Sequence, residues 1–261
     1  MTHDTFALHR GSTPLLVSMP HDGTAIPPDL AARMTPAALR TPDTDWHVSR
    51  LYAFARELGA SMLVPRHSRY VVDLNRPPDG AALYPGQHET GLCPRVTFSG
   101  DPIYLAGEDP GEPEVLARVA RYWRPYHDAL RTELDRLVGA HGRAVLWEAH
   151  TIRGAVPLFF DGALPDLNLG TAAGASCRPA LQQRLESVLA AQDAYTHVVN
   201  GRFKGGYITR HYADAARGID AVQLELAQRT YMDEATFAYD AVAAARLEPL
   251  LRRLLGAALV P

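Results

Sequence analysis

The chain has 261 residues, of which 47% are hydrophobic and 21% are charged, close to the averages of folded proteins. This composition excludes a disordered chain and a coiled coil, and the length predicts a single domain, residues 1–261, around one well-buried core. The 26 basic and 29 acidic residues give a formal charge of −3, so we expect no nucleic-acid partner and no membrane partner. No apolar run approaches the roughly 20 residues that cross a bilayer. Residues 1–10 also lack the pattern of a signal peptide, which predicts a cytoplasmic protein.

Strands and helices are predicted in alternation along the chain. Short aliphatic or β-branched runs that end near Gly, Pro or Asn predict strands at residues 15–19, 61–64, 70–74, 144–147, 196–199 and 222–226. Helices are predicted at residues 29–39, 46–58, 114–138, 179–190 and 234–255, the third being the clearest because its apolar residues recur every three or four positions. This alternation predicts a layered α/β domain whose sheet is covered on both faces, with active residues at the strand ends.

A polar stretch rich in Gly and Pro, residues 76–113, shows little periodicity and is too long for an ordinary connection. Loops of this length are usually functional or disordered. This one carries apolar side chains that can pack against the domain, namely Tyr84, Leu92, Phe98, Ile103 and Tyr104. We therefore predict an ordered loop region near the functional site.

Two histidines come directly after predicted strands, where side chains from different strands can converge. His21 follows the first strand, in a turn that reaches Gly23, and His150 follows the fourth strand. A divalent ion such as zinc binds imidazole nitrogens together with a carboxylate, and a catalytic site keeps one position open for water. Asp45, near the start of a predicted helix, is a candidate for this carboxylate.

Other interpretations of these residues are open at this point. The chain has 11 histidines, and most are expected to be exposed or to make structural hydrogen bonds. No His-x-x-x-His or His-x-x-Glu motif indicates a metal site by spacing alone. Asp43 and Asp45 are both good N-cap residues. The two cysteines are too few for a disulfide framework and wrongly spaced for a thiolate zinc site.

Glu225 lies inside an otherwise apolar predicted strand, where a carboxylate is costly unless it is paired or used. One interpretation is a polar face of the sheet, because the alternation of a strand puts Gln223 and Glu225 on the same side. The other is a general base that takes a proton from a metal-bound water.

Two segments are suited to anion recognition. In the first, Arg69, Asn75 and Arg76 flank a short predicted strand, and an arginine fork can hold a carboxylate through two hydrogen bonds. The second, residues 200–212, contains three glycines and three cations, Arg202, Lys204 and Arg210. Glycines let backbone N–H groups approach an anion, but the residue order does not match a Walker or Rossmann phosphate loop. Either segment can also be a solvated basic loop.

Together and in this order, these segments resemble the N-formylglutamate amidohydrolase, or N-formylglutamate deformylase, family of bacterial histidine degradation. The resemblance extends from Pro20 to about Met232, and its stretches are residues 20–23, 68–76, 83–86, 90–94, 164–171, 200–212 and 223–225. It implies a three-layer α/β/α sandwich with a mixed central sheet, similar to zinc-dependent exopeptidases. It also implies the hydrolysis of a small molecule, N-formyl-L-glutamate, to formate and L-glutamate.

Carried over to this sequence, the resemblance implies that His21 and His150 bind one divalent metal ion, with Zn²⁺ preferred. Glu225 becomes the counterpart of the catalytic glutamate of carboxypeptidases. The zinc exopeptidases take their middle ligand from a Glu three residues after the first His. Thr24 occupies that position here, so Asp45 is our candidate for the middle ligand.

The resemblance also assigns the substrate contacts. Asn75 and Arg76 resemble the Asn-Arg pair that holds a substrate carboxylate in zinc carboxypeptidases and aspartoacylases, and Arg69, Arg202 and Arg210 complete the predicted substrate-binding set. The sequence departs conservatively from the family pattern at two positions beside the predicted ligand His150. Glu148 stands where Asp is more usual, and Thr151 stands where Ser is more usual. The rival hypotheses are a deacylase of another N-acyl acidic amino acid or short peptide, and a non-catalytic dicarboxylate-binding protein.

Overall fold

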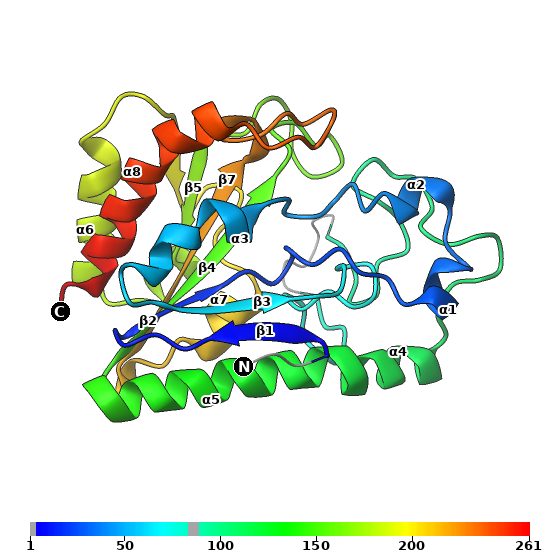
Figure 1. The fold of residues 1–261 in the computed structure, drawn as a ribbon, viewed down its shortest axis with the longest axis horizontal. Helices are drawn as coiled ribbons and strands as arrows, with labels where there is room; N and C mark the ends of the chain where they lie inside the picture. The colour runs from blue at the N-terminus through cyan, green and yellow to red at the C-terminus, as the bar shows by residue number, and fades with distance from the viewer. Residues whose placement is uncertain (1–3, 83–88) are drawn as a thin grey trace.

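A computed structural model describes residues 4–82 and 89–261, and within them seven strands form one mixed sheet (Figure 1). The strands are β1 Phe6–His9, β2 Leu15–Ser18, β3 Ser61–Pro65, β4 Ala144–Ile152, β5 Leu167–Gly170, β6 His197–Val199 and β7 Ile219–Ala227. Their order in the sheet is β1-β3-β2-β4-β7-β5-β6. β3, β2, β4 and β7 run parallel, whereas β1 and the β5–β6 pair run against their neighbours β3 and β7. The carboxyl ends of the four central strands therefore meet at one edge of the sheet.

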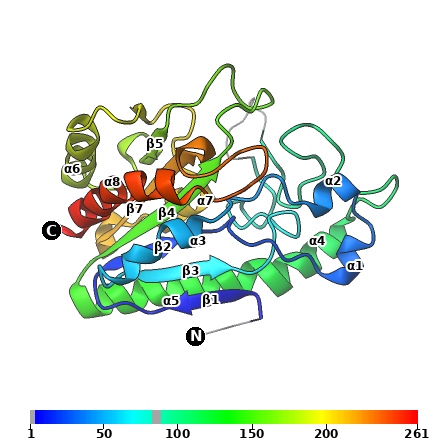
Figure 2. The same ribbon diagram turned by 45° about the horizontal axis from the view of Figure 1, so that its top comes forward.

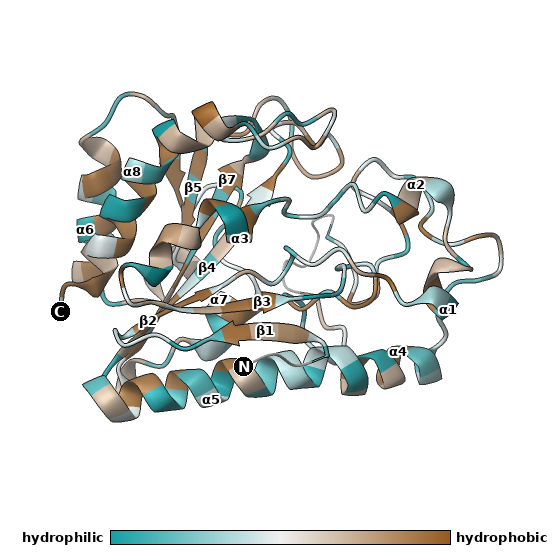
Figure 3. Ribbon diagram, in the orientation of Figure 1, coloured by the Kyte–Doolittle hydropathy of each residue, from teal (hydrophilic) through white to brown (hydrophobic). Residues whose placement is uncertain are grey.

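The helices cover both faces of this sheet (Figures 1 and 2). They are α1 Pro28–Ala31, α2 Pro36–Leu39, α3 Val48–Leu51, α4 Glu112–Arg118, α5 Arg124–His141, α6 Pro179–Ala190, α7 Tyr207–Tyr212 and α8 Ala241–Leu259. One hydrophobic cluster joins α3, α6 and α8 to one face, and a second joins α5 to the other. The apolar colouring of the strands between amphipathic helices agrees with this arrangement (Figure 3). The predicted α/β fold with a mixed, double-sided sheet is confirmed, while the likeness to zinc-dependent exopeptidases stays a prediction.

Several predicted elements differ from the observed ones, and proline accounts for two differences. The predicted helix 29–39 divides into α1 and α2, because a residue before proline avoids the helical region and Thr35 instead caps α2 with its side chain. The predicted helix 114–138 divides into α4 and α5 around a π-helical turn, Val119–Trp123. Pro125 lies just after that turn and has no N–H for the helical ladder.

The structure also corrects the strand and helix boundaries elsewhere. Residues 70–74 form no strand but a buried series of turns, in which Asp73 Oδ1 accepts a hydrogen bond from Asn75 N at 2.9 Å. The predicted helix 46–58 shrinks to α3 and a 3₁₀ turn, Ala53–Arg56, because His47 adopts a left-handed backbone conformation. The predicted helix 234–255 begins only at α8, where the Asp240 side chain caps the first turn. β1, β5 and α7 were not predicted.

Of the predicted loop region 76–113, the structure describes residues 76–82 and 89–113. Leu92, Phe98, Ile103 and Tyr104 are buried, in agreement with an ordered loop, and α4 begins at Glu112. Tyr84 and the stretch 83–86 lie outside the described residues. The two hydrophobic clusters pack on the same sheet, which supports our proposal that the chain forms one domain. Within the described residues, no helix combines the length and the apolar character that a membrane crossing requires.

Candidate metal centre and active site

Polar side chains replace apolar ones toward the carboxyl ends of β4 and β7. On the α5 side of β4, the apolar positions end at Leu146 and are followed by Glu148 and His150. β7 shows the same change, because Gln223 pairs with Glu148 and Glu225 pairs with His150 in the parallel register. Alternate residues of a strand share a face. These four side chains therefore form one buried polar patch, and residues at the start of α7 contact it through Glu148 and Gln223.

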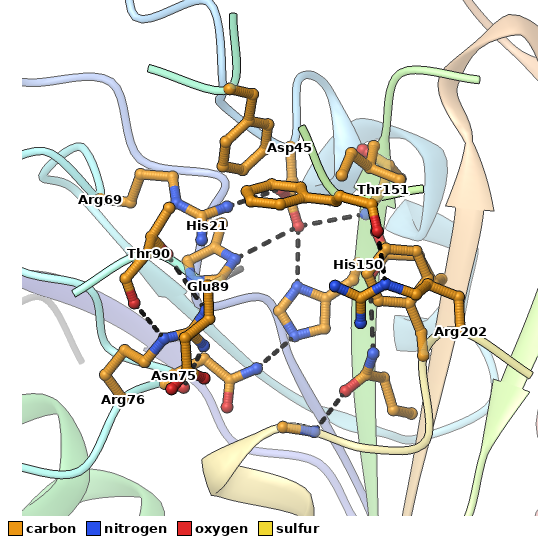
Figure 4. Close-up of a pocket in the computed structure, with 17 residues that line it drawn as sticks. His21, Asp45, Arg69, Asn75, Arg76, Glu89, Thr90, His150, Thr151 and Arg202 are labelled. Carbon is orange, nitrogen blue, oxygen red and sulfur yellow. Dashed lines mark hydrogen bonds and ion pairs between the residues drawn. The ribbon is translucent and has the colours of Figure 1, made fainter. Parts of the chain in front are cut away.

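His21, Asp45 and His150 meet at this patch (Figure 4). Each offers one ligand atom, and these atoms lie within 4.8 Å of one another although the residues come from three separate segments. Asp45 Oδ2 lies 2.9 Å from His150 Nδ1 and 3.7 Å from His21 Nδ1. Two imidazoles and one carboxylate are a donor set that divalent transition metals accept. The sequence prediction therefore named three residues that the fold brings together.

Each histidine is held on its far side by another buried carboxylate. His21 Nε2 lies 2.7 Å from Asp73 Oδ1, and His150 Nε2 lies 2.9 Å from Glu148 Oε1. Glu148 in turn accepts hydrogen bonds from the backbone and hydroxyl of Thr209, at the start of α7. A carboxylate on the second nitrogen fixes the tautomer and the orientation of a metal-binding imidazole. The cluster thus leaves both Nδ1 atoms directed at Asp45.

Neither aspartate of the loop before α3 is a helix cap. The N-cap position belongs to His47, which makes no capping hydrogen bond with its side chain. Asp43 instead accepts hydrogen bonds from Tyr70 OH at 2.5 Å and from the backbone N–H of Phe98 at 2.8 Å. Asp45 accepts one from the backbone N–H of Thr151 at 3.1 Å. The N-cap interpretation is therefore wrong for both residues.

The surroundings shift the pKa values of Asp45 and Glu225 in opposite directions. Burial opposes the charged form of Asp45, but hydrogen bonds from His150 and His21 hold its pKa below the ordinary value. Burial also opposes charge on His150, yet the charge of Glu148 and the hydrogen bond with Asp45 raise the pKa of this imidazole. Glu225 behaves differently, because burial raises its pKa to about 8 against the opposing charge of His150. Asp45 is therefore poised as an anionic ligand and Glu225 as a group that exchanges a proton.

A pocket opens over the cluster, and Glu225 lines it together with both histidines. The Glu225 side chain is buried, and its Oε2 lies 3.5 Å from Gln223 Nε2, at the limit of a hydrogen bond. Gln223 Oε1 accepts a stronger bond, 2.7 Å, from the N–H of Gly206. The carboxyl group of Glu225 is thus held weakly, beside the candidate metal ligands and facing the pocket.

Arg69 lines the pocket on the side of Asp45 (Figure 4). Its Nη2 donates to Asp73 Oδ2 at 2.6 Å, and its Nη1 lies 4.0 Å from Asp45 Oδ1. The guanidinium also lies over the ring of Phe98. The Nε–H is buried and has no hydrogen-bond partner among the described residues. This arginine therefore links the outer carboxylate Asp73 to the pocket.

Asn75 and Arg76 also line the pocket, as predicted, but part of their bonding capacity is used within the protein. Asn75 Oδ1 accepts a hydrogen bond from Ile208 N at 2.9 Å, and its Nδ2 lies 3.0 Å from His150 Nε2. Arg76 donates to Thr90 O, to Thr90 Oγ1 and to its neighbour Asn75 O. A guanidinium has five N–H groups and an amide nitrogen has two, so both side chains retain donors.

The two arginines of the second basic segment have different positions. Arg202 lines the pocket, where its Nε donates to Phe159 O at 2.9 Å. Arg210, in contrast, is exposed on α7, outside the pocket lining, and its Nε donates to Gly205 O. The structure therefore brings four of the five predicted substrate-binding residues to the pocket and does not bring Arg210 there.

Sequence reasoning missed the residues that support the site. Asp73 was not singled out, and Glu148 was noted only as a departure from the family's usual residue, although each holds one histidine. An apolar wall of the pocket, made by Phe98, Ile152, Phe159 and Phe203, was not predicted. The signal for the outer carboxylates was present in the sequence, since Asp73 and Glu148 are acidic residues within apolar runs. The wall gave no signal, because its members come from three distant segments.

Comparisons with known proteins match nearly the whole chain to members of one family. The family model for N-formylglutamate amidohydrolase matches residues 13–232. The chain is 53% identical over 253 residues to the N-formylglutamate deformylase of Pseudomonas aeruginosa, covering 97% of this chain and 95% of that relative. It is 50% identical over 254 residues to the N-formylglutamate deformylase of Pseudomonas putida, with the same coverage. The crystal structure of N-formylglutamate amidohydrolase from Ralstonia eutropha JMP134 aligns with a TM-score of 0.83 and 25% identity over 98% of both chains.

Proposed function

The chain belongs to the N-formylglutamate amidohydrolase family, and we infer that it hydrolyses the formyl amide of N-formyl-L-glutamate to formate and L-glutamate. The family resemblance predicted from the sequence is confirmed by the matches, which cover nearly all of the chain. The structural observation that supports an amide hydrolase best is the meeting of His21, Asp45 and His150 beside the buried carboxyl of Glu225. A binding protein for dicarboxylates has no need of such a group.

We propose that His21, Asp45 and His150 hold one divalent ion, and that this ion is zinc. Their donor atoms suit zinc, and the carboxylates Asp73 and Glu148 fix both imidazoles as metal ligands require. When bound, a divalent ion in such a site lowers the pKa of a water molecule and polarises the carbonyl of the substrate. With three protein ligands, the set is of the kind found in catalytic sites.

In this proposal Glu225 is the general base and then the general acid. It removes a proton from the attacking water and passes it to the amine nitrogen of glutamate as the amide C–N bond breaks. A carboxyl group works in both directions when its pKa lies near the working pH, and burial raises the pKa of Glu225 to about 8. The parallel register that pairs His150 with Glu225 supports this role, because it puts the base beside a metal ligand.

The arginines and Asn75 bind and orient the substrate in the proposed mechanism. Arg69, whose guanidinium lines the pocket beside Asp45, stabilises the negative charge that develops on the formyl oxygen. Arg76, Arg202 and Asn75 hold the two carboxylates of the glutamate moiety, and two fixed carboxylates orient the amide toward Glu225. Arg210 is left out of this set because it lies outside the pocket lining.

Two assays of the purified protein test the proposal together. Metal analysis should find one divalent ion per chain, and formate should be released from N-formyl-L-glutamate. Comparable activity on N-acetylaspartate or on short formyl peptides would favour the rival deacylase. Binding of the substrate without formate release would favour a dicarboxylate-binding protein. A cytoplasmic location and a place in histidine degradation stay predictions.

A further inference from the structure

Asp45 differs from the other two proposed ligands in how the fold supports it. His150 lies inside β4 and His21 lies three residues after the end of β2, whereas Asp45 belongs to a loop without regular secondary structure between α2 and α3. Two non-glycine residues of this loop, Thr41 and His47, have positive φ angles of 46° and 65°. Such conformations persist only where the surrounding structure determines them. Something outside the loop must therefore hold Asp45 in place.

The contacts of the loop identify what holds it. A 3₁₀ turn, Gln228–Thr230, follows β7 and ends at its C-cap residue Tyr231. Side chains of this segment donate a hydrogen bond to each of the two backbone carbonyl groups that flank Asp45. Gln228 Nε2 donates to Thr44 O at 3.0 Å, and Tyr231 OH donates to Trp46 O at 2.7 Å. Both side chains are buried, and Tyr231 is 0% exposed. The main chain on either side of Asp45 is thus fixed by one short segment.

The same two side chains also contact Thr151. Its Oγ1 lies 2.9 Å from Tyr231 OH and 3.4 Å from Gln228 Nε2, while its backbone N–H donates to Asp45 Oδ2. Gln228 and Tyr231 therefore touch both the loop that carries the carboxylate and the residue that binds it. They follow Glu225 by three and six positions, so this segment also joins the loop to the strand of the proposed base.

We propose that Gln228 and Tyr231 are positioning residues that set Asp45 for metal binding. This inference rests on the proposed metal site. The two side chains touch no proposed ligand directly and act through the main chain around Asp45 and through Thr151. Asp45 N also donates to His21 O at 3.0 Å, and His47 Nε2 lies 2.8 Å from Phe237 O, so the loop keeps anchors when either bond is lost. The loss loosens one side of the loop, and the carboxylate spends less time directed at the two imidazoles. A protein that has lost the Tyr231 hydrogen bond still folds without metal, because the aromatic ring at this position remains packed in the core.

The test is the affinity for Zn²⁺ and Co²⁺, measured by competition with a chromogenic chelator, in Tyr231→Phe and Gln228→Met. Each variant removes a donor and keeps most of the side-chain volume. Both should bind the ions about 10-fold more weakly than the wild type, the lower end of the effect of outer-shell changes. The absorption spectrum of the Co²⁺ form should also change, since a purely structural loss of stability does not alter ligand geometry.

The matched control is Tyr126→Phe, which also removes a buried hydroxyl. Tyr126 OH bonds to Ser18 Oγ at 2.9 Å and does not contact the Asp45 loop. This variant should lose thermal stability to a similar degree but keep the wild-type affinity for both ions. Equal affinities in Tyr231→Phe, Gln228→Met and Tyr126→Phe would overturn the positioning role. A wild-type protein that binds neither ion would instead overturn the proposed metal site itself.

Discussion

Among the residues that line the pocket, His21 and His150 lie at or near strand ends, and each is hydrogen-bonded to a buried carboxylate, Asp73 or Glu148. Arg76 and Arg202, in contrast, come from segments without regular secondary structure. The Arg76 guanidinium donates hydrogen bonds to oxygens of Asn75 and Thr90, and Nε of Arg202 donates to a backbone carbonyl. The two histidines of the proposed metal site, called the metal side below, thus combine positions at or near strand ends with charged partners. Arg76 and Arg202, called the arginine side, come from loops and donate hydrogen bonds to neutral oxygens.

This difference corresponds to two functions, the binding of a metal ion and the binding of the substrate carboxylates. Hydrogen bonds between charged groups are the stronger and more directional ones, so they preset ligand geometry before an ion arrives. Arg76 and Arg202 both line the pocket, where a guanidinium can hold the carboxylate of a ligand. We therefore expect changes on the metal side to abolish function and changes on the arginine side to reduce it by degrees.

The largest effect is expected from the metal ligands. His21→Ala and His150→Ala should each lose stoichiometric zinc and all measurable formate release, because two remaining ligands do not hold the ion. Metal content by elemental analysis checks this, with the exposed His141→Ala as a control that keeps both. Asp45→Ala should behave like the histidine variants. One zinc per chain in Asp45→Ala would mean that another carboxylate is the third ligand.

Glu225→Gln should have the next largest effect. The amide keeps the shape of the side chain but cannot take a proton, so turnover should fall by roughly 10²- to 10⁴-fold. Metal content and KM should stay near the wild-type values, since Glu225 lies beside the ligands without belonging to them. Steady-state kinetics with zinc-loaded enzyme measures this. An unchanged turnover number would remove Glu225 from the reaction.

The first change on the arginine side is Arg76→Lys. Lysine keeps the charge but loses the fork, so kcat/KM for N-formyl-L-glutamate should fall by roughly 10- to 150-fold, equivalent to about 1.5–3 kcal/mol for a charge-assisted hydrogen bond. Zinc content should not change. Wild-type enzyme should also discriminate against N-formylglutamine, whose amide leaves a guanidinium without its anion. Similar kcat/KM for the two substrates would mean that the arginines do not recognise the side-chain carboxylate.

The metal side was the more predictable part of the sequence. His21 and His150 each follow a predicted strand and Glu225 lies inside one, and the rule that parallel strands end at one edge was enough to bring them together. Asp45 was named from chemistry and from the resemblance, not from its neighbours. Its position depends on Gln228 and Tyr231, which bond to its neighbours Thr44 and Trp46 across 184 and 185 residues of the chain. Sequence spacing carries no trace of such contacts.

The loop side was predicted only in outline. The basic composition of residues 200–212 indicated anion binding, but it did not separate Arg202, which lines the pocket, from Arg210, which does not. The six-residue helix α7 makes this difference, and Gly205 and Gly206 before it gave no helical signal. The prediction of a strand at residues 70–74 is also wrong. Its apolar run is buried, but side chains such as Asp73 satisfy backbone groups that a ladder otherwise binds.

The smallest effect is expected from the apolar wall on the arginine side, where Phe159 lies edge-to-face with Phe98 at a ring separation of 4.9 Å. Phe159→Ala removes this ring but keeps the backbone carbonyl that orients Arg202. An aromatic pair contributes about 0.5–1.5 kcal/mol, so KM should rise by roughly 2- to 10-fold as water reaches the arginines. Phe159→Leu, which retains apolar volume, should show a smaller rise. Turnover and zinc content should stay constant in both, because the wall does not contact the ligands. A fall in turnover larger than the rise in KM would place Phe159 with the metal side, and the division of the pocket into two tasks would have to be redrawn.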